Sequence, residues 1–186
     1  MDLVTMAHDF TEDDVQKSLL ELREGGEWKP ENCKARSRIA VIVPFRDRQT
    51  HLNIWLIHVI PILKRQQLDF RIIIAEQSGQ GWFNKGKLFN AGFQYAKGLN
   101  VSCVILHDVD LYPEDDRNLY SCFDRPRHMA PYVNTLSYWL MYEQLVGGAL
   151  NMNMELYENL NGFSNKYWGW GGEDDDMGFK RRNCRS

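Results

Sequence analysis

The sequence lacks several features that would place it in a special class of protein. No apolar stretch is long enough to cross a lipid bilayer, and the first residues do not form a signal peptide. The net charge of −3 over 186 residues excludes a general electrostatic attraction for nucleic acid or an anionic membrane. The four cysteines are scattered and lack the paired short spacing of a zinc site. These absences leave an ordinary globular domain, long enough to bury roughly two thirds of its unfolded surface.

Apolar runs and helical periodicity predict the fold class. Three apolar runs are typical of strands buried on both faces: residues 39–43, 70–75 and 101–106. The segments between them, 52–68 and 87–97, have apolar residues at helical spacing, and in the second these are Leu88, Ala91, Gly92 and Tyr95. This alternation predicts an α/β protein whose mostly parallel sheet has helices on its faces.

The remaining segments suggest one domain with a polar extension. Residues 1–30 are polar and acidic with one short helical run, and no linker divides residues 31–186, which we expect to form a single domain. Ligands of such sheets bind beyond the carboxyl ends of the strands. The polar segments that follow Val43, Ala75 and Leu106 should therefore converge on one edge.

Arginines and aspartates at this edge are the first candidates for chemistry. Arg46 and Arg48 follow the first strand, where guanidinium groups can hold a diphosphate at two points, although as a pair they also fit a solvated surface. Asp108 and Asp110 follow the third strand, and residues two apart in an extended segment face the same side. Carboxylate oxygens favour magnesium or manganese over zinc. The alternative is an acidic turn, which Pro113 would support.

The segment 167–176 carries the strongest signal. It contains two tryptophans, three glycines and then four adjacent carboxylates, from Glu173 to Asp176. Adjacent like charges repel, so stability alone does not explain them, although a helix N-terminus would relieve part of the cost. Tryptophan faces suit the C–H faces of sugars, carboxylates accept hydrogen bonds from hydroxyls, and one carboxylate is free to act as a general base. The alternative is an acidic loop anchored by buried tryptophans.

Several long motifs, in this order, resemble the β-1,4-galactosyltransferase family. They are VPFRDR, FNKGKLFNAGF, HDVDLYP, RPRH, GGALNM and NGFSNKYWGWGGEDDD, spread from about Gly25 to Asp176. The resemblance implies a GT-A (Rossmann-like) fold and an inverting transfer from a UDP-sugar with Mn²⁺. It also implies Golgi residence. The sequon at Asn100 predicts N-glycosylation, which agrees with that compartment.

The resemblance also assigns residues by position. It implies that Asp174 is the catalytic base, that Asp110 binds manganese and that Cys103 and Cys122 form a disulfide. The implied donor contacts are Pro44, Phe45, Arg46, Arg48, Phe83, Lys85, Val109, Asp110, Leu145 and Trp170. The implied acceptor contacts are Tyr142, Gly172, Glu173, Asp174 and Asp175.

Two positions bear on the substrates. Leu145 stands where the family's galactosyltransferases have a tyrosine, and the smaller side chain makes room for a 2-acetamido group. We therefore expect UDP-N-acetylgalactosamine, or relaxed choice between it and UDP-galactose. Gly172 differs from the arginine of the xylose-directed branch, which favours a terminal N-acetylglucosamine acceptor attacked through its 4-hydroxyl.

Family members extend beyond both ends of this sequence, with a membrane anchor before it and further metal ligands after it. We therefore expect an incomplete GT-A domain, and the alternative function is a noncatalytic form that only binds sugar or UDP. A different GT-A enzyme, such as a polypeptide-directed transferase, would not explain VPFRDR and HDVDLYP together.

Overall fold

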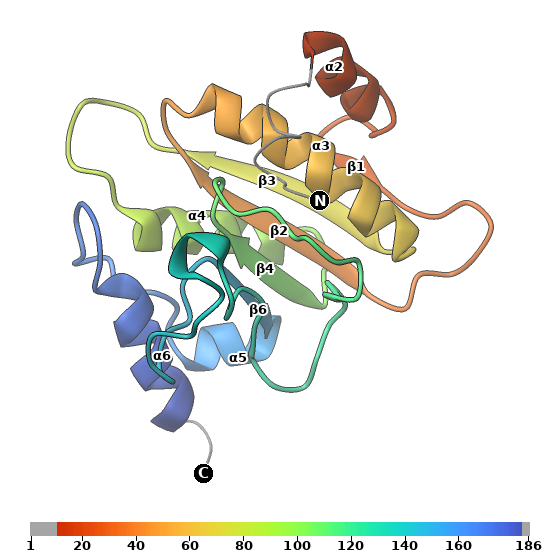
Figure 1. Cartoon of the computed structure of the whole chain (residues 1–186). Helices are drawn as coiled ribbons and strands as arrows, with labels where there is room; N and C mark the ends of the chain where they lie inside the picture. The colour runs from red at the N-terminus through yellow and green to blue at the C-terminus, as the bar shows by residue number, and fades with distance from the viewer. Residues whose placement is uncertain (1–10, 184–186) are drawn as a thin grey trace.

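The computed structural model describes residues 11–183, which form a mixed sheet of six strands with helices on both faces (Figure 1). The strands are β1 (Glu27–Trp28), β2 (Arg38–Phe45), β3 (Asp69–Glu76), β4 (Cys103–His107), β5 (Arg127–His128) and β6 (Ala149–Asn153). The helices are α2 (Glu12–Leu20), α3 (Gln49–Arg65), α4 (Lys85–Lys97), α5 (Met154–Asn159) and α6 (Glu173–Asn183), and η1 (Asn134–Leu136) is a 3-10 turn.

The three long strands form the parallel centre of the sheet. The strand order is β1-β3-β2-β4-β6-β5, and β2 pairs in parallel with both β3 and β4. Antiparallel pairs add β1 at one edge and β6 and β5 at the other. The expected α/β class, with its mixed sheet and strand–helix alternation, is therefore confirmed.

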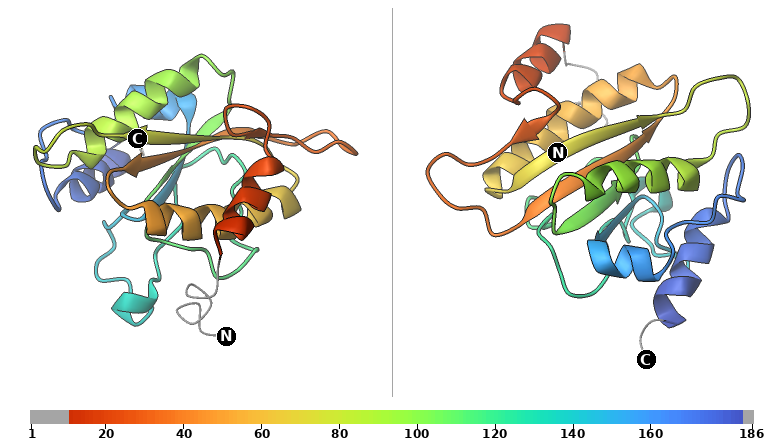
Figure 2. Two further views of the ribbon diagram at one scale, coloured as in Figure 1. Left: turned by 90° about the horizontal axis from the view of Figure 1, so that it is seen from above. Right: turned by 180° about the vertical axis from the view of Figure 1, so that it is seen from behind.

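Alternation along β2 divides the core between the two faces. Ile39, Val41 and Val43 pack against α3, whereas Ala40 and Ile42 pack on the side of α4 and α5. Figure 2 shows α3 on one side of the sheet and α4 with α5 on the other. Both β2 and β4 are buried on both faces, as expected of strands enclosed by helices.

Two details of the sequence prediction are wrong. The strand β3 is not buried on both faces, since Ile74 is 36% exposed. The neighbouring strand β1 pairs only with Phe70 and Arg71, so the end of β3 lies at the edge of the sheet. In α4 the buried stripe contains Phe89 and Phe93, while Tyr95 is 60% exposed, because the helix face that packs on the sheet runs through Phe89, Phe93 and Ala96.

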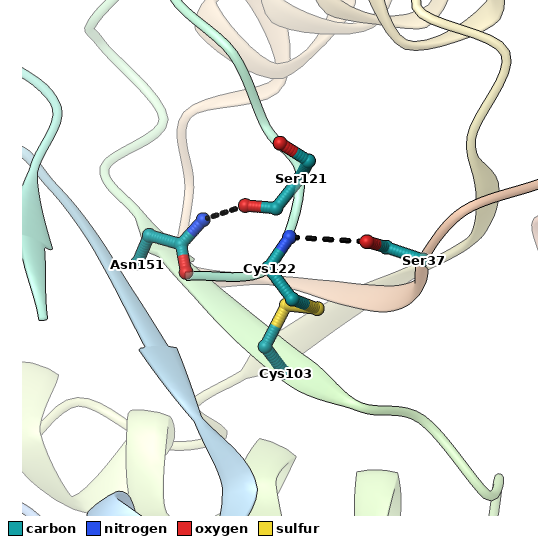
Figure 3. Close-up of a disulfide and its surroundings, with 5 residues drawn as sticks. All are labelled: Ser37, Cys103, Ser121, Cys122 and Asn151. Atoms are coloured by element: carbon teal, nitrogen blue, oxygen red, sulfur yellow. Dashed lines mark hydrogen bonds between the residues drawn. A yellow bond between two sulfur atoms is a disulfide. The ribbon is translucent and has the colours of Figure 1, made fainter. Parts of the chain in front are cut away.

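A disulfide fixes the long segment between β4 and β5 to the sheet. Cys103 in β4 is bonded to Cys122, which confirms the pairing that the family resemblance implies (Figure 3). Around it, the Ser37 hydroxyl accepts a hydrogen bond from the Cys122 N–H at 3.2 Å, and the Asn151 amide donates to the Ser121 carbonyl at 2.8 Å (Figure 3). The segment that begins with Asp108 is thus held firmly at its far end. Cys184 lies outside the described residues.

Candidate active site

The ends of β2 and β4 bring an arginine and an aspartate together. Arg48 follows β2, and its Nη1 donates to Asp110 Oδ2 at 2.8 Å. Both side chains are about half exposed, so the pair remains accessible to a ligand. The predicted convergence at the carboxyl edge is therefore confirmed for these two residues, which are 62 positions apart in the sequence.

A mostly buried lysine is the centre of the site. Lys85 begins α4, because the Asn84 side chain caps the helix by accepting a hydrogen bond from the Lys87 N–H at 2.8 Å. The Lys85 ammonium lies 2.7 Å from Asp174 Oδ2, 2.9 Å from Glu173 Oε1 and 3.4 Å from Asp108 Oδ2. One cation thus connects the segment after β4 with the acidic start of α6.

This arrangement changes the proton affinities of its members. Burial opposes the charge of Lys85, but the carboxylates of Asp108, Asp174 and Glu173 outweigh burial and raise the pKa of its ammonium. Burial raises the pKa of Asp108 to about 6, although Lys85 acts in the opposite direction. Burial likewise raises the pKa of Asp174, with Lys85 again opposing the shift. A carboxylate with a raised pKa is a stronger base than an exposed one.

The four adjacent carboxylates lie where the helix can accommodate them. Residues Glu173 to Asp176 form the first turn of α6, and Lys180, Arg181 and Arg182 form its last turn. The partial positive charge of a helix N-terminus stabilises anions there. The preceding Gly172 has φ +91°, and a Cβ at this position would be 2.7 Å from the Tyr167 ring. The interpretation of a helix N-terminus is therefore confirmed.

The Gly147-Gly148 pair forms the wall beside Asp174. A Cβ on Gly147 would be 2.7 Å from Asp174 Oδ2, so the missing side chain lets the carboxylate lie against the backbone. The Gly147 carbonyl is 2.8 Å from His128 Nε2. Leu145, two residues earlier, is half-buried. On the other side of this wall, Gly148 packs against Leu111 and Ala130, which line a cavity of ≈ 830 Å³ that also includes Asp110.

The remaining predicted donor residues differ in how far their side chains are exposed. Arg46 Nη1 donates to the Gly81 carbonyl at 2.6 Å, and its guanidinium lies 5.3 Å from the Phe83 ring centre. Pro44, Phe45 and Val109 are buried. Trp170 is 99% exposed.

On the acceptor side, the Tyr142 hydroxyl donates to Asp175 Oδ1 at 2.5 Å, and this bond raises the pKa of Tyr142 to about 12. Asn100 is exposed at the end of α4.

Asp108 and Asp110 lie at the same edge of the sheet but pair with different cations. Asp108 faces Lys85, whereas Asp110 faces Arg48. The chain turns directly after β4, so the alternation of an extended strand no longer applies. Asp110 is the more exposed carboxylate of the two.

Sequence reasoning missed a buried polar group directly behind this turn. His107 ends β4 with its Nδ1 3.0 Å from the Trp55 indole nitrogen and its Nε2 2.9 Å from the Tyr120 hydroxyl. Burial lowers the pKa of His107 to about 4, so the ring is neutral. The three residues are far apart in the sequence, and no spacing pattern could have joined them.

The described residues offer few ligands for a metal. Within residues 11–183, no group of three or more histidine, cysteine, aspartate or glutamate side chains could hold a metal ion. The same part of the chain contains no helix long and apolar enough to cross a membrane.

Family models match nearly the whole chain. The N-terminal region of glycosyl transferase group 7 matches residues 2–123, and the N-terminal domain of galactosyltransferase matches residues 127–185. Beta-1,4-galactosyltransferase 5 of Danio rerio is 48% identical over 171 residues, which are 89% of this chain and 45% of the relative. Beta-1,4-galactosyltransferase 6 of Homo sapiens is 46% identical over 159 residues, 85% of this chain and 42% of the relative. The chain therefore spans less than half the length of these relatives.

A solved structure supports the same relationship. The catalytic domain of Drosophila beta1,4galactosyltransferase 7, in complex with xylobiose, superimposes with a TM-score of 0.73 at 36% identity and covers 79% of this chain and 61% of that one. A mutant of that enzyme was solved with manganese, UDP-Gal and xylobiose, at the same TM-score and 37% identity. The GT-A fold is thus established. With these matches and the site geometry described above, the chain belongs to the β-1,4-galactosyltransferase family.

Proposed function

We propose that this chain carries the donor and acceptor sites of an inverting glycosyltransferase. The enzyme would move N-acetylgalactosamine or galactose from a UDP-sugar to the 4-hydroxyl of a terminal N-acetylglucosamine. The observation that carries the proposal is the ionic cluster in which Lys85 bridges Asp108 and Asp174, with the Arg48–Asp110 pair beside it. A cation for the diphosphate and a carboxylate for the acceptor thus meet at one edge of the sheet.

Asp174 would act as the general base. Its raised pKa favours removal of the proton from the attacking hydroxyl, and Gly147 leaves room beside its carboxylate. The base works only when deprotonated, so the transfer rate should rise as the pH passes upward through this raised pKa. Glu173 and Asp175 would hold the acceptor, and Tyr142 orients the Asp175 carboxylate through its hydrogen bond.

Asp110 would supply a protein ligand to manganese. Its carboxylate is a hard oxygen donor and is half exposed, which fits such an ion, but it is a single ligand. The rest of the coordination shell would come from diphosphate oxygens, water and groups outside the described residues. When bound, the ion would neutralise the charge of the leaving diphosphate. Arg46 and Arg48 would grip the same diphosphate, and Phe83 would contact the nucleotide.

The donor sugar is the finer part of the proposal. Leu145 lies two residues before Gly147 and is smaller than the tyrosine of the family's galactosyltransferases, which favours N-acetylgalactosamine. The relatives described above are named galactosyltransferases. Competition between the two UDP-sugars, in wild-type and Leu145→Tyr protein, distinguishes them. A strong wild-type preference for UDP-galactose would contradict the role given to Leu145.

A transfer assay onto N-acetylglucosamine tests the reaction itself. Asp174→Asn should lower kcat by roughly 10²- to 10⁴-fold while leaving UDP binding intact. Equal rates for wild type and Asp174→Asn would refute the assigned base.

A second candidate function is binding of UDP or sugar without transfer. The single metal carboxylate among the described residues favours it. Manganese-dependent UDP binding with no product under any donor would support this alternative. The family's Golgi lumen, with a membrane anchor in a full-length form, is the proposed location for either function.

A further inference from the structure

Three tryptophans are exposed around the acceptor loop, and the proposed reaction assigns only one of them. Trp82 is 76% exposed and Trp168 is 54% exposed, in addition to Trp170. Large aromatic side chains left in water at one place commonly mark a binding surface. Trp82 precedes the donor residue Phe83, and nothing in the proposed transfer uses its ring.

The Trp82 indole is held in place before any ligand binds. The backbone carbonyl of Trp82 accepts a hydrogen bond from the Gln77 side-chain amide at 2.9 Å, and the preceding Gly81 carbonyl accepts one from Arg46 at 2.6 Å. Its ring lies against the backbone of Gly169, where a Cβ would approach Trp82 Cε3 to 3.1 Å. Gly169 has φ +86°, so glycine serves both the backbone angle and the contact with the ring. The rest of the ring faces solvent.

Trp82 is also joined to the acceptor loop. The Gly169 N–H donates to the Phe83 carbonyl at 2.7 Å, so a backbone hydrogen bond connects the two loops. Gly169 lies only five positions before Asp174, a reach of at most about 17 Å for extended chain. The Lys87 ammonium lies 5.9 Å from the ring centre of Trp168, the residue before Gly169, so a hydrogen-bond donor lies next to this aromatic side chain.

We propose that Trp82, seated on Gly169 and flanked by Trp168, is an accessory site for an inner sugar ring of the acceptor glycan. The indole would cover the C–H face of a pyranose, and Lys87 would donate to its hydroxyls. This inference rests on the proposed function, because the ring it would bind belongs to the same glycan whose terminal sugar Asp174 would activate. A rigid aromatic face loses little conformational entropy when it binds such a ring.

Calorimetric titrations test the site with N-acetylglucosamine and its β-1,4-linked trimer, in the presence of UDP and Mn²⁺. The wild-type chain should bind the trimer roughly three- to tenfold more tightly than the monomer. Trp82→Ala should remove this advantage without changing monomer affinity, and Trp82→Phe should restore part of it. Tyr95→Ala is the control, because Tyr95 is also an exposed aromatic residue but lies on the outer side of α4.

The outcomes separate this inference from the proposed function. Monomer binding with no gain for the trimer, or a gain that survives Trp82→Ala, overturns the accessory site and leaves the proposed function intact. Failure of both sugars to bind refutes the acceptor site itself, and the accessory site with it. Sedimentation of the chain with phosphatidylcholine vesicles that is lost in Trp82→Ala would identify a lipid surface as the occupant and also overturn the proposal.

Discussion

Replacing Lys85 by methionine removes the only cation that the structure shows among Asp108, Glu173 and Asp174. Removing one partner of a buried ion pair typically costs about 3–5 kcal/mol, because the remaining charge is left uncompensated. We therefore expect Lys85→Met to lower the free energy of unfolding by about that amount at pH 7.5. Lys87→Met is the matched control on the same helix, since Lys87 contacts the half-exposed Trp168, and it should cost less than about 1 kcal/mol.

The pH dependence of this loss is the sharper part of the prediction. Burial raises the pKa of Asp108 from 3.8 to about 6, so its contribution to stability is present at low pH and is lost as pH rises through 6. Without Lys85 the pKa values of Asp108 and Asp174 rise further, and protonation near pH 5 relieves the repulsion. The deficit of Lys85→Met should therefore shrink on acidification. Urea unfolding of both variants at pH 7.5 and pH 5 measures it. A Lys85→Met deficit no larger than that of Lys87→Met, or one independent of pH, would refute the reasoning.

Three further predictions follow from single contacts. Reducing the Cys103–Cys122 bond, which closes a loop of sequence separation 19, should destabilise the chain by about 3 kcal/mol, seen as a lower midpoint of thermal unfolding with reductant; an unchanged midpoint would contradict it. Gly178→Ala lies inside α6, where alanine ordinarily stabilises a helix by about 1 kcal/mol. Here its Cβ would collide with the Gln144 carbonyl, so urea unfolding should reveal a loss of about 1–3 kcal/mol, and a gain would disprove the contact. Expression in a secretory host should attach a glycan to the exposed Asn100, with a mass increase that Ser102→Ala abolishes; masses that differ only by the serine oxygen would exclude glycosylation.

The sequence predicts the centre of the fold better than its edges. The strands β2 and β4 could be predicted from their apolar runs, because strands enclosed by helices on both faces have few polar positions. The exposure of Ile74 depends on how short β1 is, which no local pattern in β3 reveals. Helical spacing likewise located α4, but it did not show that Phe89 and Phe93 are buried and that Tyr95 is not.

The candidate site was likewise only partly predictable from the sequence. Strand ends indicated where Arg48 and Asp110 converge, since the topology of a parallel sheet fixes that edge, whereas the role of Asp174 came from the family resemblance. The separate partners of Asp108 and Asp110 depend on a turn, and the central position of Lys85 depends on how α4 and α6 pack. The contact between Trp82 and Gly169 joins two loops 87 positions apart. Such contacts arise from tertiary packing and have no signature in local sequence.

Titration of UDP into the chain with and without Mn²⁺, repeated for Asp110→Asn, tests the central claim most directly. The account predicts UDP binding that requires Mn²⁺ in the wild type and is weakened at least tenfold by Asp110→Asn, with unfolding free energy unchanged within about 1 kcal/mol. UDP binding of equal strength without the metal, or in Asp110→Asn, would contradict it.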